Sequence, residues 1–351
     1  MKAVRSWSAP GDVYVLDALV HRSSKHLLGL LSNGKLRVIS SPDQDAFSDV
    51  LLGSGTGTGQ ARQVTGIACA GCSLLSSEGQ AANLVWSCSV DGTVAAYDLN
   101  TRTPGQPVGS CSLPRTKVSS VDVGLNGMLV ACGTEEGFDS KVVFWDVRNL
   151  SAPLGKYVES HSDHITAVRF SPDGSPGLVS GSEDGLVCAF DVSKSSETAA
   201  LKSVLKAGSA VSRLGFFGAN FQGIYVTTTT ETLSLFEIGS CAMISSYDND
   251  LMAGTGCRET LQETAKLEIN YLIDCLWEPR TQKLLLCAGN TDGVGFGFEM
   301  TLNGFVPLGP LPGGHSEVIR TAKIVELGPD KGGFGIVTGG EDGKMCIWTP
   351  E

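Results

Sequence analysis

One structural unit recurs along the sequence, and this repetition constrains the fold more than any other feature. Each copy is an apolar stretch, a short turn of small or acidic residues, and a second apolar stretch that ends in an aromatic residue. Clear copies are LVWSCSVDGTVAAYD (84–98), LVSGSEDGLVCAFD (178–191) and IVTGGEDGKMCIW (336–348). Asp-Gly between two alternating apolar runs is the strongest local signal of a β-hairpin. The sequence therefore predicts an all-β fold built from hairpins.

Weaker copies of the unit bring the total to seven. The shortest spacings between successive turns, 45 and 46 residues, match the roughly 40–45 residues of a four-stranded propeller blade, and the longer spacings predict insertions. We therefore predict a single seven-bladed β-propeller over residues 1–351. The expected blade turns lie at Asn33, Asp91, Asp139, Asp184, Thr230, Asp292 and Asp342.

Charge and hydropathy exclude several classes of protein. Asp and Glu outnumber Lys and Arg by 37 to 26, for a net charge of −11, and the basic stripe of nucleic-acid-binding domains is not visible. No apolar run reaches the ~18 residues of a membrane-spanning helix. The first residues, MKAVRSWSAPGD, lack the apolar run of a signal peptide. We expect an intracellular protein, cytoplasmic or nuclear, that binds neither nucleic acid nor membrane.

The small-residue motifs give little evidence of a metal or cofactor. Cys69-Ala-Gly-Cys72 is the only CxxC among 11 scattered cysteines, and no second pair follows to complete a zinc site. An ordinary turn is the favoured interpretation, with a redox pair or metal half-site as the alternative. GSGTGTG (53–59) has no following GK[ST] and is expected to be an insertion rather than a phosphate loop. We predict no cofactor, and a helix only at 258–269, within a long insertion (246–269).

The repeats resemble those of the WD-repeat β-propeller family. FWD (144–146), FD (190–191) and YD (97–98) stand where that family ends the third strand of a blade. SHSDHITAVRFSPDG (160–174) and GGHSEVIRTAKI (313–324) are similar to the Gly-His segment that leads into a first strand. The resemblance covers nearly the whole chain. It implies a non-catalytic platform that binds other proteins or peptides.

The resemblance also implies a polar network inside some blades. A His before the first strand, a Ser or Thr on the second, the turn Asp and an aromatic residue on the third would be joined by hydrogen bonds. The last blade has the complete set, and in the fourth Phe190, which has no donor, replaces Trp. The expected members are His315, Thr338, Asp342 and Trp348 in the last blade, and His161, Ser180 and Asp184 in the fourth.

A Ser–His–Asp set is also the inventory of a hydrolase triad. No GxSxG elbow surrounds Ser180, and its hydroxyl is expected to face the blade interior. We therefore predict a structural role and no catalytic residue.

The two ends of the sequence predict how the ring closes. The chain stops at Glu351, just after the third-strand Trp348, so the last blade would lack its outer strand. KAVRSW (2–7) precedes the expected first strand of blade one and is available as that strand. We predict that residues 2–8 complete the last blade, which closes the ring and protects strand edges.

In this family the turns between second and third strands line one rim of the ring. Here that rim is expected to be partly acidic and to favour a basic partner segment, although a merely solvated rim is an equal alternative. The Asp side chains are expected to be used structurally and the Glu side chains to be available. The carboxylates are Glu135, Glu136, Asp139, Glu183, Asp184, Glu341 and Asp342.

A second binding motif follows the third blade. Trp145-Asp146-Val147-Arg148 matches the WDxR core by which some WD-repeat proteins dock onto the adaptor of cullin-RING ubiquitin ligases. LVACGT (129–134) is similar to the preceding part of that motif, but the long turn at 135–141 departs from its spacing. The favoured prediction is a scaffold or adaptor, and the alternative is a substrate receptor of a cullin-RING ubiquitin ligase. An enzyme would need a cluster of reactive groups at the central channel, and the sequence suggests none.

Overall fold

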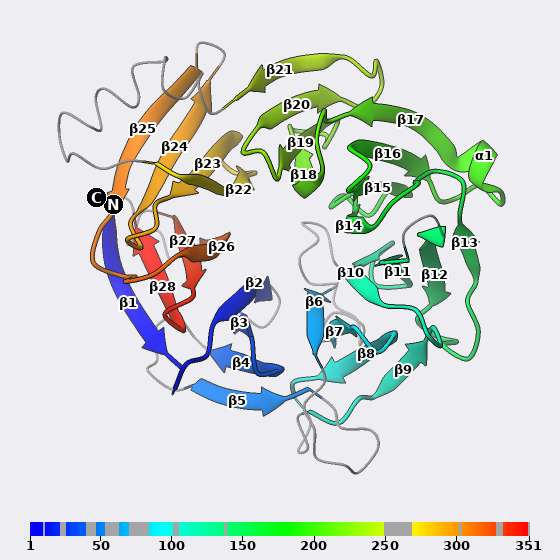
Figure 1. Cartoon of the computed structure of the whole chain (residues 1–351), viewed down its shortest axis with the longest axis horizontal. Coiled ribbons are helices and arrows are strands. Elements are labelled where there is room, and N and C mark those ends of the chain that lie inside the picture. Colours follow the sequence, from blue (N-terminus) through cyan, green and yellow to red (C-terminus); the bar gives the residue numbers. More distant parts are fainter. Residues whose placement is uncertain are drawn as a thin grey trace.

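The computed structural model arranges its strands as seven four-stranded antiparallel sheets around a central channel (Figure 1). Each sheet is one blade, and its first strand lines the channel. The blades follow chain order, with the last one completed by the first strand of the chain. The structure describes residues 1–9, 11–21, 26–39, 47–52, 63–69, 84–100, 105–136, 139–248, 269–301, 304–327 and 333–349.

The blades and their elements are as follows. Blade 1 contains β2 (Val15–His21), β3 (His26–Leu31), β4 (Lys35–Ile39) and β5 (Phe47–Leu51). Blade 2 contains β6 (Val64–Cys69), β7 (Leu84–Ser89), β8 (Thr93–Asp98) and β9 (Gly109–Ser112). Blade 3 contains β10 (Val118–Gly124), β11 (Leu129–Thr134), β12 (Val142–Asp146) and β13 (Gly155–Tyr157). Blade 4 contains β14 (Ile165–Phe170), β15 (Gly177–Ser182), β16 (Leu186–Asp191) and β17 (Leu201–Lys206), with the short helix α1 (Glu197–Ala200) before β17. Blade 5 contains β18 (Val211–Phe217), β19 (Gly223–Thr228), β20 (Leu233–Glu237) and β21 (Met243–Tyr247). Blade 6 contains β22 (Tyr271–Glu278), β23 (Lys283–Gly289), β24 (Gly295–Thr301) and β25 (Gly304–Leu311). Blade 7 contains β26 (Ile319–Glu326), β27 (Phe334–Gly340), β28 (Lys344–Thr349) and β1 (Lys2–Ser8).

The hairpin turns explain why Asp-Gly recurs in the sequence. In blade 7 Gly343 has φ +68°, a left-handed conformation that L side chains rarely adopt. A Cβ at this position would also collide with the carbonyl oxygen of Val13. Blade 5 has no glycine at its turn, and Glu231 occupies the left-handed region instead, with φ +59°. The turn prediction is thus confirmed even where its sequence signal is weakest.

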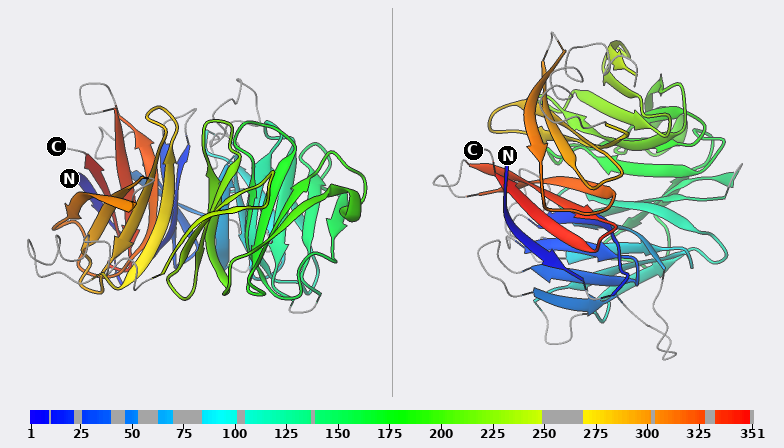
Figure 2. Two further views of the ribbon diagram at one scale, coloured as in Figure 1. Left: turned by 90° about the horizontal axis from the view of Figure 1, so that it is seen from above. Right: turned by 60° about the vertical axis from the view of Figure 1, so that its left-hand side comes forward.

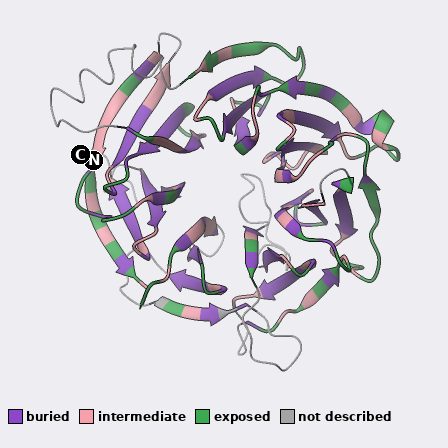
Figure 3. Cartoon of the chain, in the orientation of Figure 1, coloured by how far each residue is buried: buried purple, intermediate pink, exposed green. Residues whose placement is uncertain are grey.

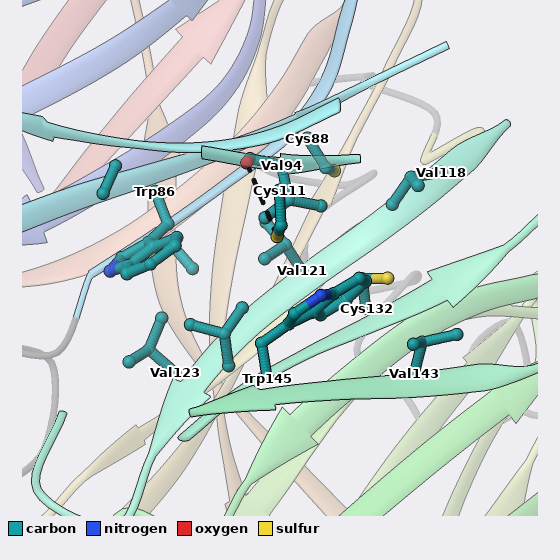
Figure 4. Close-up of a cluster of buried hydrophobic side chains, with 13 residues drawn as sticks. Trp86, Cys88, Val94, Cys111, Val118, Val121, Val123, Cys132, Val143 and Trp145 are labelled. Atoms are coloured by element: carbon teal, nitrogen blue, oxygen red, sulfur yellow. Dashed lines mark hydrogen bonds between the residues drawn. The ribbon is translucent and has the colours of Figure 1, made fainter. Parts of the chain in front are cut away.

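Burial is concentrated in the middle strands of each blade (Figure 3). The outer strand β1 alternates between exposed and partly exposed residues, with only Trp7 buried, whereas β27 is buried along nearly its whole length. Most of the core lies between neighbouring blades. Between blades 2 and 3, Trp86 and Trp145 pack around three cysteines (Figure 4). The thiols of Cys88 and Cys111 have their pKa raised to about 12 by burial, so they behave as small apolar groups.

Hydroxyl groups on the first strands join several blades directly. Thr65 in blade 2 donates a hydrogen bond of 2.6 Å to the carbonyl oxygen of Val118 in blade 3. Thr166 in blade 4 donates one of 2.8 Å to the carbonyl oxygen of Val211 in blade 5. Both occupy the second position of their strand, next to a register shift. The accepting carbonyl groups belong to the first residues of β10 and β18, which also lie next to register shifts, so the neighbouring blade satisfies a carbonyl at an irregular part of the ladder.

The chain closes its own ring as predicted. Strand β1 pairs antiparallel with β28, and Trp7 lies opposite Met345. Trp7 is 5% exposed and packs into the core between blades 7 and 1. Strands from the two ends of the sequence thus form one sheet, and its fourth strand covers β28.

Three sequence expectations fall outside the described residues. They concern Cys72 of the CxxC motif, the segment 53–59 and the helix expected at 258–269, of which only Ile269 is described. In the described part of the chain, no helix is long and apolar enough to cross a membrane.

Removal of residues 1–9 is expected to lower the melting temperature by many degrees, because it uncovers β28 and removes Trp7 from the core. Loss of one large buried aromatic side chain alone costs about 3–5 kcal/mol. The measurement is differential scanning calorimetry of the truncated and full-length proteins. Lys2→Ala, which changes only an exposed side chain of β1, is the control. Equal melting curves for truncated and full-length protein would contradict this account of closure.

Candidate functional site

The strands of each blade run between the two faces of the ring (Figure 2). We call one face the rim face: it carries the turns between second and third strands and the segments that lead into the first strands. We call the other the loop face: it carries the loops between first and second strands. The predicted network and the rim glutamates lie at the rim face, and the channel runs from one face to the other.

In blade 7 four side chains form one continuous chain of hydrogen bonds. The indole N–H of Trp348 donates to Thr338 Oγ1 at 2.8 Å. Thr338 Oγ1 lies 2.8 Å from His315 Nε2, and His315 Nδ1 lies 3.0 Å from Asp342 Oδ1. One set of roles satisfies every group: the Thr338 hydroxyl donates to Nε2, and the Nδ1–H of His315 donates to Asp342. The network therefore holds the segment before β26 against the turn after β27.

The charge of Asp342 is stabilised by its partners. Burial by itself raises the pKa of this carboxyl group, but hydrogen bonds from His315 and from the backbone N–H of Ser316 hold it well below its ordinary value. The backbone N–H of Lys344 also donates to Oδ1, at 3.1 Å. The side chain of Asp342 is 4% exposed, so its oxygens serve the turn.

Blade 4 has the same arrangement without its last member. His161 Nε2 lies 2.7 Å from Ser180 Oγ, and His161 Nδ1 lies 3.2 Å from Asp184 Oδ2. These distances also suit a hydrolase triad, but Ser180 is completely buried, so no substrate could reach its Oγ. Phe190 occupies the place of the tryptophan and is buried. The group is therefore suited to hold the turn, as in blade 7.

The remaining blades satisfy their turns by other means. In blade 5 the Thr228 hydroxyl contacts the hydroxyl groups of Thr230 and Thr232 at 3.0 and 2.6 Å. In blade 6 the cap is Asn290, whose Oδ1 accepts from the N–H of Val294 at 2.9 Å, and Asp292 is exposed. In blade 3 Asp139 is exposed, and the buried Ser140 accepts from the N–H of Glu136 at 3.3 Å.

The rim glutamates that the sequence singled out lie beside basic groups. Glu136 contacts Lys141 at 2.6 Å, and Glu341 contacts Arg320 at 2.5 Å. Glu135 lies 3.6 Å from Lys117. Glu183 keeps the most exposed carboxylate of the four, with a side chain that is 47% exposed. Of these four carboxylates, those of Glu183 and Glu135 are the most exposed, and they form a negative region on blades 3 and 4.

A histidine sits within this negative region. His164 Nδ1 lies 3.6 Å from Glu183 and 3.9 Å from Glu135, and its Nε2 lies 3.9 Å from Asp163. Ligand atoms of Asp163, His164 and Glu183 all lie within 4.8 Å of one another. Of the groups that the structure describes, this is the one with metal-ligand spacing. Its members are partly or fully exposed, and such surface groups are common without an ion.

The WDxR residues lie in blade 3, where two of them are fixed by their surroundings. Trp145 is 1% exposed in the core between blades 2 and 3. Arg148 follows the third strand, and its Nε and Nη2 donate to the two oxygens of Asp146 at 2.9 and 2.6 Å. This pair lowers the pKa of Asp146 to about 2. The Arg148 side chain is still 77% exposed.

Sequence reasoning missed a group of charged side chains in the central channel. Lys323 contacts Asp274 at 2.7 Å between blades 7 and 6. Arg213 of blade 5 lies 4.0 Å from Asp17 of blade 1. Asp122 of blade 3 and Arg169 of blade 4 lie on the wall of the same hollow as Asp17 and Lys323. Their positions in the sequence could have revealed them. They lie at or near the third and fifth positions of the first strands, and these positions face inward together.

The family match follows from this geometry and from direct comparison. Residues 152–191, which span the end of blade 3 and most of blade 4, match the model of the family described as "WD domain, G-beta repeat". The chain is 31% identical over 267 residues to the WD repeat-containing protein 89 homolog of Dictyostelium discoideum, covering 76% of this chain and 68% of that protein. The chain belongs to the WD-repeat family.

Two further similarities agree with membership of the WD-repeat family. The WD repeat-containing protein GTS1 of Arabidopsis thaliana is 30% identical over 276 residues, which cover 76% of this chain and 66% of that protein. A chain in the structure called "Crystal Structure of Mitotic Checkpoint Complex" superposes with a TM-score of 0.71 over 99% of this chain and 91% of its own length. That chain is only 16% identical, so the likeness concerns the fold alone. WD-repeat propellers generally act as non-catalytic scaffolds for protein–protein interaction.

The WD-repeat network in blade 7 makes a specific prediction about pH. Asp342→Asn keeps the shape of the side chain but removes its charge and one acceptor, which is expected to cost about 1–3 kcal/mol of unfolding free energy at pH 7. The folded-state pKa of Asp342 is lowered. Its carboxylate therefore stabilises the fold above roughly pH 4, and the contribution is lost as pH falls through the folded value. The deficit of the variant should shrink below pH 4.

Denaturant unfolding at a series of pH values from 7 to 3 measures this difference. Asp292→Asn, at the exposed turn of blade 6, is the matched control and should follow the wild type at every pH. A deficit of Asp342→Asn that stayed constant across the series would rule out the charge as the stabilising element.

Proposed function

We propose that this protein is a non-catalytic interaction platform whose rim face recruits a basic segment of a partner protein. The observation that carries the proposal is the exposed negative region of blades 3 and 4. There Glu135, Asp163 and Glu183 surround a single histidine, and Lys117 is their nearest fully charged base. Asp163 and Glu183 both have side chains that are 47% exposed.

Rigidity supports the same proposal. The backbone N–H of Glu183 donates to the carbonyl oxygen of His164, and Asp184 accepts from the N–H of Leu186 and contacts His161. The turn that bears Glu183 is therefore fixed, so binding would cost little ordering of the protein itself. The net charge of −11 adds a long-range attraction for a basic segment.

Charge reversal at two rim positions tests this proposal. Glu135→Lys combined with Glu183→Lys is expected to weaken binding of a short peptide rich in lysine and arginine by at least about tenfold, because complementary charges become like charges. Isothermal titration calorimetry at two salt concentrations measures the affinity and its salt dependence.

The control changes the net charge equally on the other face. Glu299→Lys combined with Glu326→Lys, at the loop-face ends of β24 and β26, should leave peptide affinity within about twofold of wild type. The proposal is wrong if both double variants weaken the peptide equally, or if neither does.

A second candidate function rests on the exposure of Arg148. We propose as the alternative that the loop after β12 docks onto the adaptor of a cullin-RING ubiquitin ligase, with this protein as substrate receptor. The guanidinium plane is already oriented by its two hydrogen bonds to Asp146, and such a preorganised group can pair with acidic residues of a partner.

Arg148→Ala is expected to abolish co-purification of the adaptor with the tagged protein, because it removes the planar set of donors that would pair with acidic residues of the adaptor. Immunoblotting for the adaptor after affinity purification is the measurement. Arg280→Ala removes an arginine that is 61% exposed at the loop face and is the control. Absence of adaptor from the wild-type sample, or its retention by Arg148→Ala, would eliminate this function.

A further inference from the structure

The loop face has two adjoining hollows at the central channel. One measures about 220 Å³ and is walled by residues of the first strands of blades 1 to 4, by the loops that follow those strands in blades 3 and 4, and by Lys323. The other measures about 210 Å³ and is walled chiefly by blades 5, 6 and 7. They share the side chains of Leu19, Pro172 and Lys323. Each is smaller than the roughly 300–1,000 Å³ of a drug-sized ligand site, so the size suits a side chain.

The outer walls of these hollows are apolar and partly aromatic. Leu125, Phe170 and Pro172 line the first hollow. Phe216 and Trp277 line the second. Trp277 is only partly buried, and its ring centroid lies 6.3 Å from that of Phe217. These walls favour a flat apolar body, because aromatic rings gain both buried area and ring contacts there.

The inner wall is charged, and its charges balance. Asp274 is paired with Lys323 at 2.7 Å, and Asp17 faces Arg213 at 4.0 Å. Burial raises the pKa of Asp17, but the cations around it, Lys323 first, bring it below its ordinary value. These pairs leave little net charge to attract an ion.

The remaining two charged groups are less completely paired. Asp122 Oδ2 accepts from the backbone N–H of Phe170 at 2.7 Å, and Arg169 Nη1 donates to the carbonyl oxygen of Val168 at 2.8 Å. Neither has an ion-pair partner within 4.0 Å among the residues that the structure describes. Burial raises the pKa of Asp122, against the pull of Arg169. Asp122 can therefore accept, and Arg169 can donate, further hydrogen bonds at the wall of one small hollow.

Arg213 separates these hollows from the other end of the channel. It lies at the third position of its strand, whereas Asp122, Arg169 and Lys323 lie at the fifth of theirs, closer to the loop face. From blade 5 it reaches Asp17 of blade 1 and donates to the carbonyl oxygen of Arg320 in blade 7 at 3.2 Å. A group that binds in the hollows would therefore come from the loop face.

We propose that these hollows hold the side chain of a tyrosine from a partner protein. The inference rests on the proposed role as an interaction platform and adds a second contact, on the opposite face. A phenol has a flat apolar body for the walls and a neutral hydroxyl group that donates to Asp122 and accepts from Arg169. A phenylalanine would desolvate both groups without using their remaining hydrogen-bonding capacity, which is costly. A phosphorylated or otherwise charged tip would enter a region without a matching net charge.

The test compares small probes that differ only at the tip. N-acetyl-tyrosinamide, N-acetyl-phenylalaninamide and N-acetyl-O-phosphotyrosinamide are titrated into the full chain, and affinities are measured from protein NMR shifts. The tyrosine probe is expected to bind at least about tenfold more tightly than either of the others, because a site with buried polar groups discriminates against analogues that cannot pair with them. Equal or stronger binding of another probe, or no binding of the tyrosine probe at millimolar concentration, would overturn the proposal.

Two variants identify the site. Asp122→Leu combined with Arg169→Met removes both polar partners at unchanged net charge, and it should bring the tyrosine-to-phenylalanine affinity ratio close to one. Trp277→Ala should weaken the tyrosine and phenylalanine probes together by about tenfold or more. Asp292→Asn, at the exposed turn of blade 6 on the rim face, is the control and should change neither affinity. If one of these variants melts below the assay temperature, the result for the other variant decides the test. An unchanged tyrosine-to-phenylalanine affinity ratio in the folded double variant would refute the site.

These outcomes are independent of the rim proposal. The basic-peptide titration reports on blades 3 and 4 of the rim face alone, and the tyrosine probe carries no net charge. Failure of one leaves the other experiment able to succeed.

Discussion

The pairing of β1 with β28 is the interaction on which the rest of the structure depends. A four-stranded blade has two faces to cover, and it buries them only by packing between two neighbours. In an open row of seven blades, the outer faces of the first and last would stay exposed. Strand β1 comes from the start of the chain but completes the blade formed by its end, and Trp7 packs in the core between blades 7 and 1. The sheet hydrogen bonds thus close the ring and create the core between blades 7 and 1.

Around the closed ring, two kinds of hydrogen bond join neighbouring blades. Blades 2 to 5 use neutral hydroxyl groups such as Thr65 and Thr166, which satisfy a carbonyl group of the next blade. From blade 5 onward, charged and phenolic groups take over. Tyr225 donates to Asp274 at 3.3 Å, and Thr321 of blade 7 donates to Asp17 of blade 1 at 3.1 Å. The change from hydroxyl groups to charged groups puts much of the channel charge on one side. It also explains why the channel contains charged side chains that the repeat pattern does not predict.

The repeat and the hairpin turns were predictable because each depends on local chemistry, and Asp-Gly marks a turn wherever it stands. The contact of His315 with Thr338 was implied by the resemblance to WD repeats, and the ring closure by the strand that the last blade lacks and the first residues supply. The channel was not predictable in this way. Asp122 and Arg169 lie about one repeat apart in the sequence, and only the packing of the first strands of two neighbouring blades brings them onto one wall. The pairing of Glu341 with Arg320 was missed because it depends on the register of β26 against β27, in which Ile319 lies opposite Gly340.

The two faces of the ring therefore differ in what they can offer a partner. On the rim face, the turns of blades 4 and 7 are held by internal hydrogen bonds, and carboxylates such as Asp342 are used up in holding them. What remains for recognition is surface charge, which attracts partners from a distance and contributes modest, salt-dependent affinity. On the loop face, aromatic walls meet groups with unused hydrogen-bonding capacity in a small volume. Such hollows contribute selectivity at short range, so the rim face is suited to capture a partner and the loop face to discriminate among those captured.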